Sequence, residues 1–312
     1  MLFKVVAVGA GVMDLEKLRD SPVGQLVRIT GWDSRFGEQY DYFAYVPDPL
    51  PATVELDAAT YTAVIDASAA LARADQAASL LPNPVLLARP ATRREAVSTS
   101  ALEGTYAVLS DVLEADFLDA DQITGSLAEV RNYVTAAERA YELIGQGQSL
   151  SIRMLEDLQR ELLRGTPSDG PHAGRIRTTQ VFIGVGNRRV ESARFVPPPA
   201  DHRLADGLLF WENWAERTRS TVPAMIRIAL AHYQFEALHP FHDGNGRLGR
   251  LVIALQLLSA RASCATRYST YRHGWNRTGR NTRMACSVYR RPATGIPGCA
   301  SSRQLSMRRL WR

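Results

Sequence analysis

The sequence lacks several features that mark particular protein classes. Its three cysteines, Cys264, Cys286 and Cys299, lie far apart and show none of the paired spacing of a zinc site. No apolar run reaches the length of a membrane-spanning helix. Residues 2–13 are apolar, but the stretch is short, contains Lys4 and has no good cleavage site, so we do not interpret it as a signal peptide. These absences argue against a membrane association and favour the cytoplasm.

Acidic residues are missing from residues 261–312, which hold twelve arginines and no Asp, Glu or Lys. The net charge of the chain is +5, and it becomes −7 when these twelve arginines are left out. One interpretation of this tail is a nucleic-acid-binding arm. We favour translation in a wrong reading frame that begins near residues 259–263, because codons shifted by one base across residues 292–303 can spell Gly-Asp-Trp-Asp-Pro-Trp. We therefore expect a disordered or poorly packed tail and no nucleic-acid partner.

The most informative segment is residues 239–250, which read His-Pro-Phe-His-Asp-Gly-Asn-Gly-Arg-Leu-Gly-Arg. Residues 222–238 before it are apolar at helical spacing, and a second apolar helix is expected from Gly246. Because proline pushes the preceding residue out of the α region, His239 should end the first helix. The segment is therefore predicted to be a loop at the N-terminus of a buried helix, where unpaired N–H groups bind anions.

Several residues of this loop suit a ligand that contains phosphate. Gly244 and Gly246 let the backbone approach an anion closely, and Asn245 adds an amide donor. Arg247 and Arg250 are three residues apart on the expected helix, so both can face one pocket.

Two other side chains of the loop supply reaction chemistry. Asp243 is an oxygen ligand of the kind that Mg²⁺ takes together with substrate phosphates. His239 can accept a proton from an incoming hydroxyl. Phe241 is expected to pin the loop into the core. A transition-metal cluster of His239, His242 and Asp243 is disfavoured because no fourth ligand has a suitable spacing, and His242 is interpreted as a solvated, variable position.

At every defined position the segment resembles the Fic-domain signature, His-Pro-Phe-x-(Asp/Glu)-Gly-Asn-(Gly/Lys)-Arg-x-x-Arg. Fic proteins are mostly adenylyltransferases that use ATP to place AMP on a Ser, Thr or Tyr hydroxyl of a target protein. The resemblance implies that His239 is the base and that Asp243 holds Mg²⁺. It also implies contacts to the nucleotide from Gly244, Asn245, Gly246, Arg247 and Arg250. Transfer of UMP or of a phosphorylated alcohol stays open, because the signature contacts phosphates and not the base.

A second motif lies upstream, at residues 93–105, and is predicted to be a short helix that ends at Gly104. Read alone, Glu103 is an exposed acid at a helix end. Together with the signature, residues 99–104 resemble the Fic inhibitory pattern, (Ser/Thr)-x-x-x-Glu-(Gly/Asn), of the class with an N-terminal inhibitory helix. The resemblance implies that Glu103 pairs with Arg250, which then cannot clamp a γ-phosphate. In some relatives this glutamate also assists the removal of AMP.

Residues 174–198 are predicted to form a β-hairpin, with a β-rich stretch at 180–185 and a turn at Gly186-Asn187. The resemblance makes this hairpin a flap that pairs with the backbone of the target by strand addition. Val181, Phe182 and Ile183 are expected at the docking edge, without a catalytic role.

The chain is expected to be mostly α: a Fic-type helical bundle with a small β-hairpin flap and an N-terminal extension. Helices are predicted at about 56–80, within 106–165 and at 203–217. We divide the chain into an N-terminal Fic-associated region, a Fic core that includes the inhibitory helix near 93–104, and the arginine-rich tail, at residues 1–90, 91–260 and 261–312.

The leading functional prediction is an ATP- and Mg²⁺-dependent protein adenylyltransferase that Glu103 holds inactive. Its partner would be a target-protein hydroxyl, with the chain itself as a second target, and relatives often form homodimers. A regulatory DNA-binding protein is a rival, but no winged-helix module is evident. An inactive, truncated Fic scaffold is the other rival.

Overall fold

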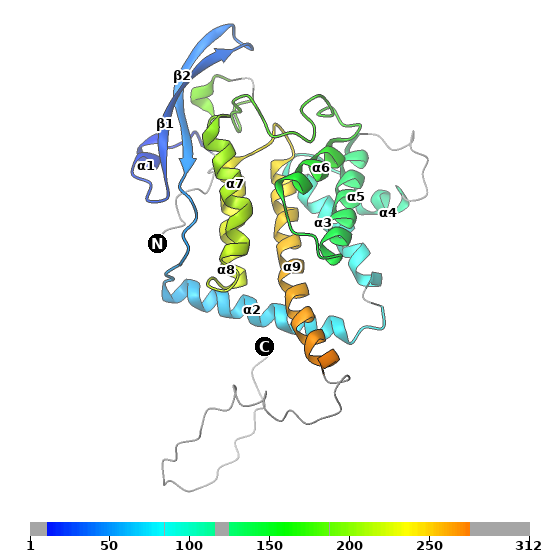
Figure 1. Ribbon diagram of the computed structural model, residues 1–312. Coiled ribbons are helices and arrows are strands. Elements are labelled where there is room, and N and C mark those ends of the chain that lie inside the picture. Colours follow the sequence, from blue (N-terminus) through cyan, green and yellow to red (C-terminus); the bar gives the residue numbers. More distant parts are fainter. Residues whose placement is uncertain (1–10, 84, 116–124, 187, 275–312) are drawn as a thin grey trace, which may run out of the picture. The chain divides into compact units, whose positions relative to one another are not determined.

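The computed structural model describes residues 11–83, 85–115, 125–186 and 188–274 (Figure 1). The described residues up to Ala265 form one compact unit, which contains both motifs. The elements are, in chain order, α1 Leu15–Arg19, β1 Gly24–Asp33, β2 Glu38–Pro47, α2 Ala58–Ser79, α3 Val85–Leu102, α4 Leu109–Glu114, α5 Gly125–Gly145, α6 Ile152–Leu163, η3 Val190–Ser192, α7 His202–Arg217, α8 Ala224–Leu238 and α9 Asn245–Gly274. This mostly helical architecture confirms the predicted fold class.

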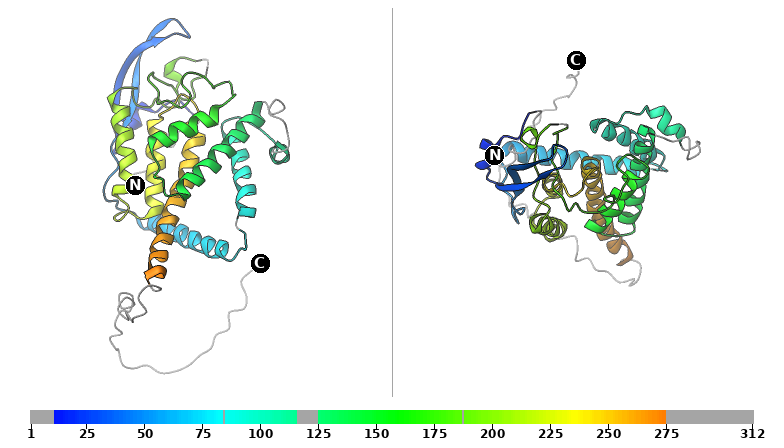
Figure 2. Two further views of the ribbon diagram at one scale, coloured as in Figure 1. Left: turned by 45° about the vertical axis from the view of Figure 1, so that its right-hand side comes forward. Right: turned by 90° about the horizontal axis from the view of Figure 1, so that it is seen from above.

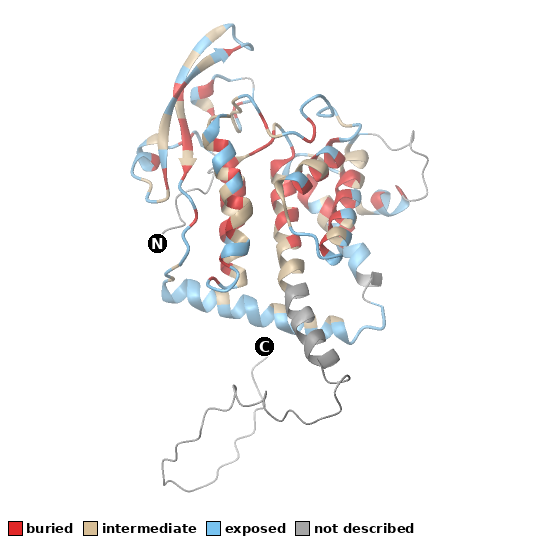
Figure 3. Cartoon of the chain, viewed as in Figure 1, coloured by how far each residue is buried: buried red, intermediate tan, exposed pale blue. Residues whose placement is uncertain are grey.

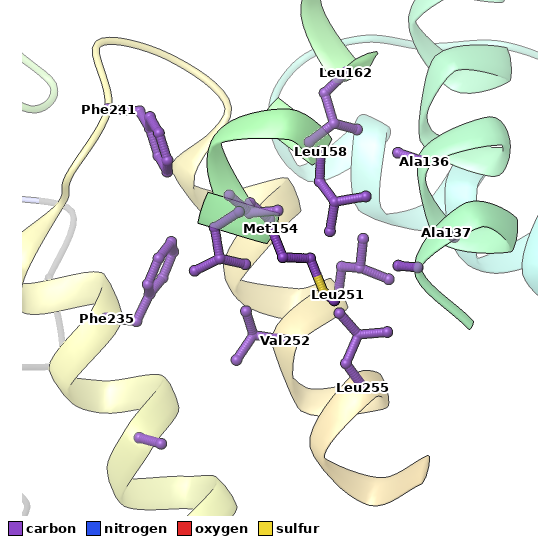
Figure 4. Packing of buried hydrophobic residues seen from close by; sticks show 14 of the residues in the cluster. Ala136, Ala137, Met154, Leu158, Leu162, Phe235, Phe241, Leu251, Val252 and Leu255 are labelled. Atoms are coloured by element: carbon purple, nitrogen blue, oxygen red, sulfur yellow. The ribbon is translucent and has the colours of Figure 1, made fainter. Parts of the chain in front are cut away.

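The main hydrophobic core surrounds the first half of α9. Leu248, Leu251 and Leu255 of this helix are completely buried, and they belong to one hydrophobic cluster with side chains of α3, α5, α6, α7 and α8. Buried residues line these helices in Figure 3, and Figure 4 shows Leu251 and Leu255 among side chains of α5, α6 and α8. Helices α3, α5 and α6 lie side by side in both views of Figure 2. Each buried leucine of this kind contributes about 1.5–3 kcal/mol relative to an exposed one. The helix that begins in the signature loop is therefore firmly fixed in position.

Helix α3 carries the second motif and ends where the sequence predicts. It begins earlier than expected, at Val85, and its last residue is Leu102. Gly104 has a φ of +87°, which glycine adopts readily, and the N–H of Thr105 donates to the carbonyl of Ser100 at 3.0 Å. This C-terminal cap fixes Glu103 at the end of the helix.

A second hydrophobic cluster joins the N-terminal hairpin to the flap. Strands β1 and β2 are antiparallel, and Tyr45 of β2 is completely buried against Phe195 of the flap, with ring centroids 6.0 Å apart. The N–H of Tyr45 also donates to the carbonyl of Val196 at 2.9 Å. This sheet was not predicted from the sequence.

The flap itself is less regular than the predicted hairpin. Its two extended pieces meet in a single bridge, Ile183 to Phe195, within the described residues. Gly184 and Gly186 have positive φ angles of 73° and 55° and bend the first piece away after the bridge. Prolines follow the second piece and cannot donate to a longer ladder.

Helix α9 continues as a backbone helix through Gly274, so residues 261–274 are not disordered in backbone, although the expectation was a disordered or poorly packed segment. Residues 275–312 lie outside the described residues, so the expectation for this part of the tail stays a prediction. Among the helices of the described part, none combines the length and apolar character that crossing a membrane requires.

Candidate functional site

His239 stands directly after α8 in an unusual backbone conformation. The helix ends at Leu238, as predicted, and His239 has φ 48° and ψ 64°, the left-handed region. It is the one non-glycine residue with positive φ in the described part of the chain. Such a conformation costs about 1–3 kcal/mol and persists only where the surroundings hold it.

Arg177 provides much of this hold, although the sequence analysis gave it no role. Its side chain is 2% exposed, and Nε donates to the carbonyl of His239 at 2.8 Å. Nη2 donates to the carbonyls of Pro198 at 2.6 Å and Leu238 at 3.3 Å, and the backbone N–H of Arg177 donates to Pro240 at 2.9 Å. One buried side chain thus ties the end of α8 to both ends of the flap.

The imidazole of His239 is kept neutral by its surroundings. Burial and the positive charge of Arg177 lower the pKa of His239 to about 4. A neutral imidazole can accept a proton at neutral pH, which is what a general base must do. The burial of Arg177 lowers its own pKa to about 10, so it stays charged at neutral pH.

Phe241 and Asn245 hold the loop between α8 and α9 rigid. Phe241 is completely buried in the main core, as expected. The side chain of Asn245 is also buried, and its amide spans the loop: Oδ1 accepts from the N–H of Phe241 at 2.9 Å, and Nδ2 donates to the carbonyl of Phe241 at 2.8 Å. We expected this amide to donate to an anion, but both of its polar atoms bond to the backbone of Phe241 within the loop. A nucleotide contact from Asn245 stays a prediction.

The N-terminus of α9 is already approached by a carboxylate. Glu103 lies so close to Gly246 that a Cβ atom added there would clash with its Oε1. The same Oε1 accepts from Nη2 of Arg250 at 2.5 Å, so the expected pair is present. Thr99 contributes as well, because its carbonyl accepts from Nη2 of Arg250 at 3.2 Å and its hydroxyl accepts from Nε. Both ends of the second motif therefore bind Arg250.

Arg247 has a carboxylate partner that the sequence analysis did not find. It is 4% exposed, and its Nη1 donates to Oε2 of Glu129, on α5, at 3.0 Å. The hydroxyl of Thr105 donates to the same oxygen at 2.8 Å. Glu129 thus connects the first signature arginine to the chain just after the second motif. No short motif contains Glu129, so the sequence carried no signal for it.

Asp243 faces solvent beside the glycine-rich turn. Its side chain is 48% exposed, Oδ1 accepts from the N–H of Gly244 at 2.6 Å, and Oδ2 accepts from the hydroxyl of Ser168 at 2.6 Å. The described residues contain no group of three or more His, Cys, Asp or Glu side chains able to hold a metal ion. A lone, accessible carboxylate fits Mg²⁺, whose remaining ligands are usually waters and substrate phosphates. It does not fit a transition metal.

Two further residues shape the loop around Asp243. Gln159 of α6 is buried, and its Nε2 donates to the carbonyl of Asp243 at 3.0 Å, while its Oε1 accepts from the N–H of Gly174. His242 is not the solvated side chain that we expected: it is half-buried and contacts the ring of His172, with centroids 4.5 Å apart. The loop that precedes the flap therefore packs directly against the signature.

The three expected docking residues lie in the first extended piece of the flap. Val181, Phe182 and Ile183 are all half-buried. The ring of Phe182 makes an edge-on contact with Tyr40 of β2, at a centroid distance of 5.2 Å. The N-terminal hairpin thus supports this piece from one side.

Comparison with known proteins extends this description. Residues 61–142 match the family model described as Fic/DOC family N-terminal, and residues 149–257 match the Fic/DOC family model. Protein adenylyltransferase fic-1 of Caenorhabditis elegans is 30% identical over 172 residues, which cover 51% of this chain and 30% of that protein. Protein adenylyltransferase Fic of Culex quinquefasciatus is 28% identical over 167 residues, which cover 52% of this chain and 30% of that protein.

Among solved structures, this chain resembles a Fic family protein from Desulfovibrio desulfuricans G20. The TM-score is 0.50 at 24% sequence identity, and the match covers 72% of this chain and 67% of the other. At this identity the likeness concerns the fold. The matches to the curated relatives span less than a third of their length, as the 30% coverage of each shows.

Proposed function

Because this chain belongs to the Fic/DOC family, we propose that it is a protein adenylyltransferase, which moves AMP from ATP to a Ser, Thr or Tyr hydroxyl of a target protein. One observation carries the proposal. A neutral imidazole, an accessible carboxylate, two arginines and a glycine-rich helix N-terminus come together in a loop whose backbone is fixed by buried hydrogen bonds.

The residues divide the reaction between them. The target hydroxyl gives its proton to His239 while its oxygen attacks the α-phosphorus of ATP. The new P–O bond replaces the bond between the α-phosphorus and the bridging oxygen, and pyrophosphate leaves. The helix N-terminus at Gly246, together with Arg247 and Arg250, binds the negative charge of the phosphates. Asp243 would hold Mg²⁺, which supplies positive charge to the phosphate chain.

We also propose that Glu103 inhibits this reaction from within the chain. Its carboxylate occupies the space over Gly246 and holds the guanidinium of Arg250, the two features that a γ-phosphate would use. A phosphate and this carboxylate repel each other and compete for the same donors. ATP then binds in a pose unsuited to transfer until Glu103 is displaced.

The test is labelling of the purified protein with ATP that carries radioactivity in either the α- or the γ-phosphate. We expect the Glu103→Gly variant to label itself from α-labelled ATP, well above wild type, and to show no label from γ-labelled ATP. Label from the γ-position would indicate a kinase, and equal labelling of wild type and variant would refute the inhibitory role. Parallel reactions with the other nucleoside triphosphates show whether adenine is preferred.

A further inference from the structure

The flap presents one free β-edge, because the N-terminal hairpin covers its other side. The N–H of Tyr45 in β2 donates to Val196, and the N–H of Ile183 donates to the carbonyl of Phe195 at 2.9 Å. These bonds order the extended pieces as β2, then residues 195–196, then residues 181–184. Residues 181–184 are therefore the outermost piece of this small sheet.

The main chain of this outermost piece is open to a further strand. Ile183 turns its N–H and carbonyl toward Phe195, so the preceding residue of the strand, Phe182, turns its N–H and carbonyl to the opposite side. The chain bends at Gly184, directly after the bridge. In the described part of the chain no main-chain hydrogen bond involves Phe182 or Gly184. An extended segment of a target protein fits this edge by strand addition.

A single arginine side chain lies across this edge. The Cγ, Cδ and Nε atoms of Arg194 stand over Gly184, where a side chain at that position would otherwise be. Arg194 belongs to the inner piece, and its side chain crosses Gly184 of the outermost piece. It is exposed, and among the described residues it makes no ion pair within 4.0 Å.

The charge of the flap agrees with this arrangement. Residues 174–198 contain five arginines and one glutamate. Arg177 is buried under the loop, and Arg189 is paired with Glu38 of β2 at 2.8 Å. Arg194 is thus a positive charge without a partner at the place where a target segment would lie. Strands stand about 4.8 Å apart in a sheet, so a residue of the target segment opposite Gly184 would lie within reach of the guanidinium of Arg194.

We infer that the flap selects target segments that carry an aspartate or glutamate opposite Gly184, and that Arg194 binds this carboxylate. The inference rests on the proposed function, and it adds the chemical class of the substrate to it. This placement of Arg194 requires glycine at position 184, since any side chain there would displace Arg194. Arg194 is a specificity residue with no part in the chemistry at His239.

The test uses synthetic peptides with one acceptor hydroxyl and either acidic residues or their amide counterparts beside it. In the Glu103→Gly background we expect acidic peptides to be modified with about fivefold higher kcat/KM, through a lower KM, since exposed charge pairs contribute at most about that factor. Arg194→Gln should abolish the difference, and Arg194→Glu should favour lysine-bearing peptides. Arg189→Gln is the matched control and should keep the preference.

Equal use of acidic and neutral peptides, or a preference that survives in Arg194→Gln, would overturn the inference. If no peptide is modified at all, the proposed function is in doubt, and fluorescence anisotropy of the same peptides without nucleotide decides the inference separately. An Arg194-dependent preference for acidic peptides that weakens at high salt supports it. Equal binding of both peptides overturns it.

Discussion

Replacing Glu103 with glutamine should weaken the hold on Arg250 and remove the repulsion between Glu103 and a γ-phosphate, and so tighten the binding of ATP. In the structure, Oε1 of Glu103 lies 2.5 Å from Nη2 of Arg250 and also blocks the space over Gly246. Glutamine has nearly the same shape as glutamate but carries no charge. The substitution therefore changes the electrostatics at the N-terminus of α9 and leaves the packing of α3 in place.

The size of the effect follows from the exposure of the pair. A hydrogen bond between charged groups contributes about 1.5–3 kcal/mol when it is enclosed. The side chains of Arg250 and Glu103 are 27% and 40% exposed, so solvent screens the pair and a lower value applies. We take about 1–1.4 kcal/mol for the pair of Glu103 and Arg250. Since about 1.4 kcal/mol corresponds to a tenfold change in affinity, ATP should bind about 5- to 10-fold more tightly to the variant.

Isothermal titration calorimetry with ATP and with ADP measures this directly. ADP has no γ-phosphate, so its affinity should differ less than about twofold between wild type and Glu103→Gln. Arg250→Gln alone and combined with Glu103→Gln completes a double-mutant cycle, in which the gain should vanish without the arginine. Equal gains for ATP and ADP, or a gain that persists without Arg250, would refute competition between Glu103 and the γ-phosphate.

Three other predictions concern charged or titratable groups around the site: Arg177, Glu236 of α8, whose Oε1 lies beside Gly249 of α9, and His239. Arg177→Lys keeps the charge but loses most of the bonds to the carbonyls of His239, Pro198 and Leu238, so the thermal unfolding midpoint should fall by about 5–10 °C; an unchanged midpoint in calorimetry would contradict this anchoring role. Burial raises the pKa of Glu236 from 4.5 to about 7, so the folded state holds an extra proton between these values and stability falls as pH rises through this window. In denaturant unfolding, the free energy of unfolding of Glu236→Gln minus that of wild type should therefore be larger at pH 8 than at pH 4. The same difference at both pH values would argue against a raised pKa of Glu236. Because partial burial and the charge of Arg177 lower the pKa of His239 to about 4, kcat/KM of the Glu103→Gly enzyme should not fall with a midpoint near 6.5 as the pH is lowered; such a midpoint would contradict a neutral, half-buried base.

The signature loop could be predicted well because its constraints are local. A proline ends α8 after Leu238, and glycines permit the turn into α9. The pair of Glu103 and Arg250 could be predicted only through the resemblance to a known pattern. Their sequence separation, 147 residues, is far beyond the reach of any periodicity argument.

Most of the residues that hold the loop could not be predicted. Arg177, Gln159 and Glu129 come from other elements, and each acts through contacts across the fold. Arginine, glutamine and glutamate are ordinarily surface residues, so a single sequence gives no reason to bury them. For the same reason the sequence did not reveal the partners of Asn245: its amide was expected to donate to an anion, but it bonds within the loop.

The N-terminal hairpin was missed for a related reason. Its strands alternate only weakly between buried and exposed residues, so they lack the regular period of two that marks a strand in a sequence. Its stability depends on contacts such as that between Tyr45 and Phe195, which lie far apart in the chain. The flap was recognised from its turn residues, but its pairing is limited to one bridge because glycines bend the first piece and prolines follow the second.

The central claim is that His239 drives transfer of AMP once Glu103 is removed. Intact-mass spectrometry of Glu103→Gly after incubation with ATP and Mg²⁺ tests it most directly, with the Glu103→Gly/His239→Ala double variant as the control. We predict a mass increase of one AMP unit in the first protein, lost when Mg²⁺ is chelated, and no increase in the second. The same adduct in both proteins would contradict the claim.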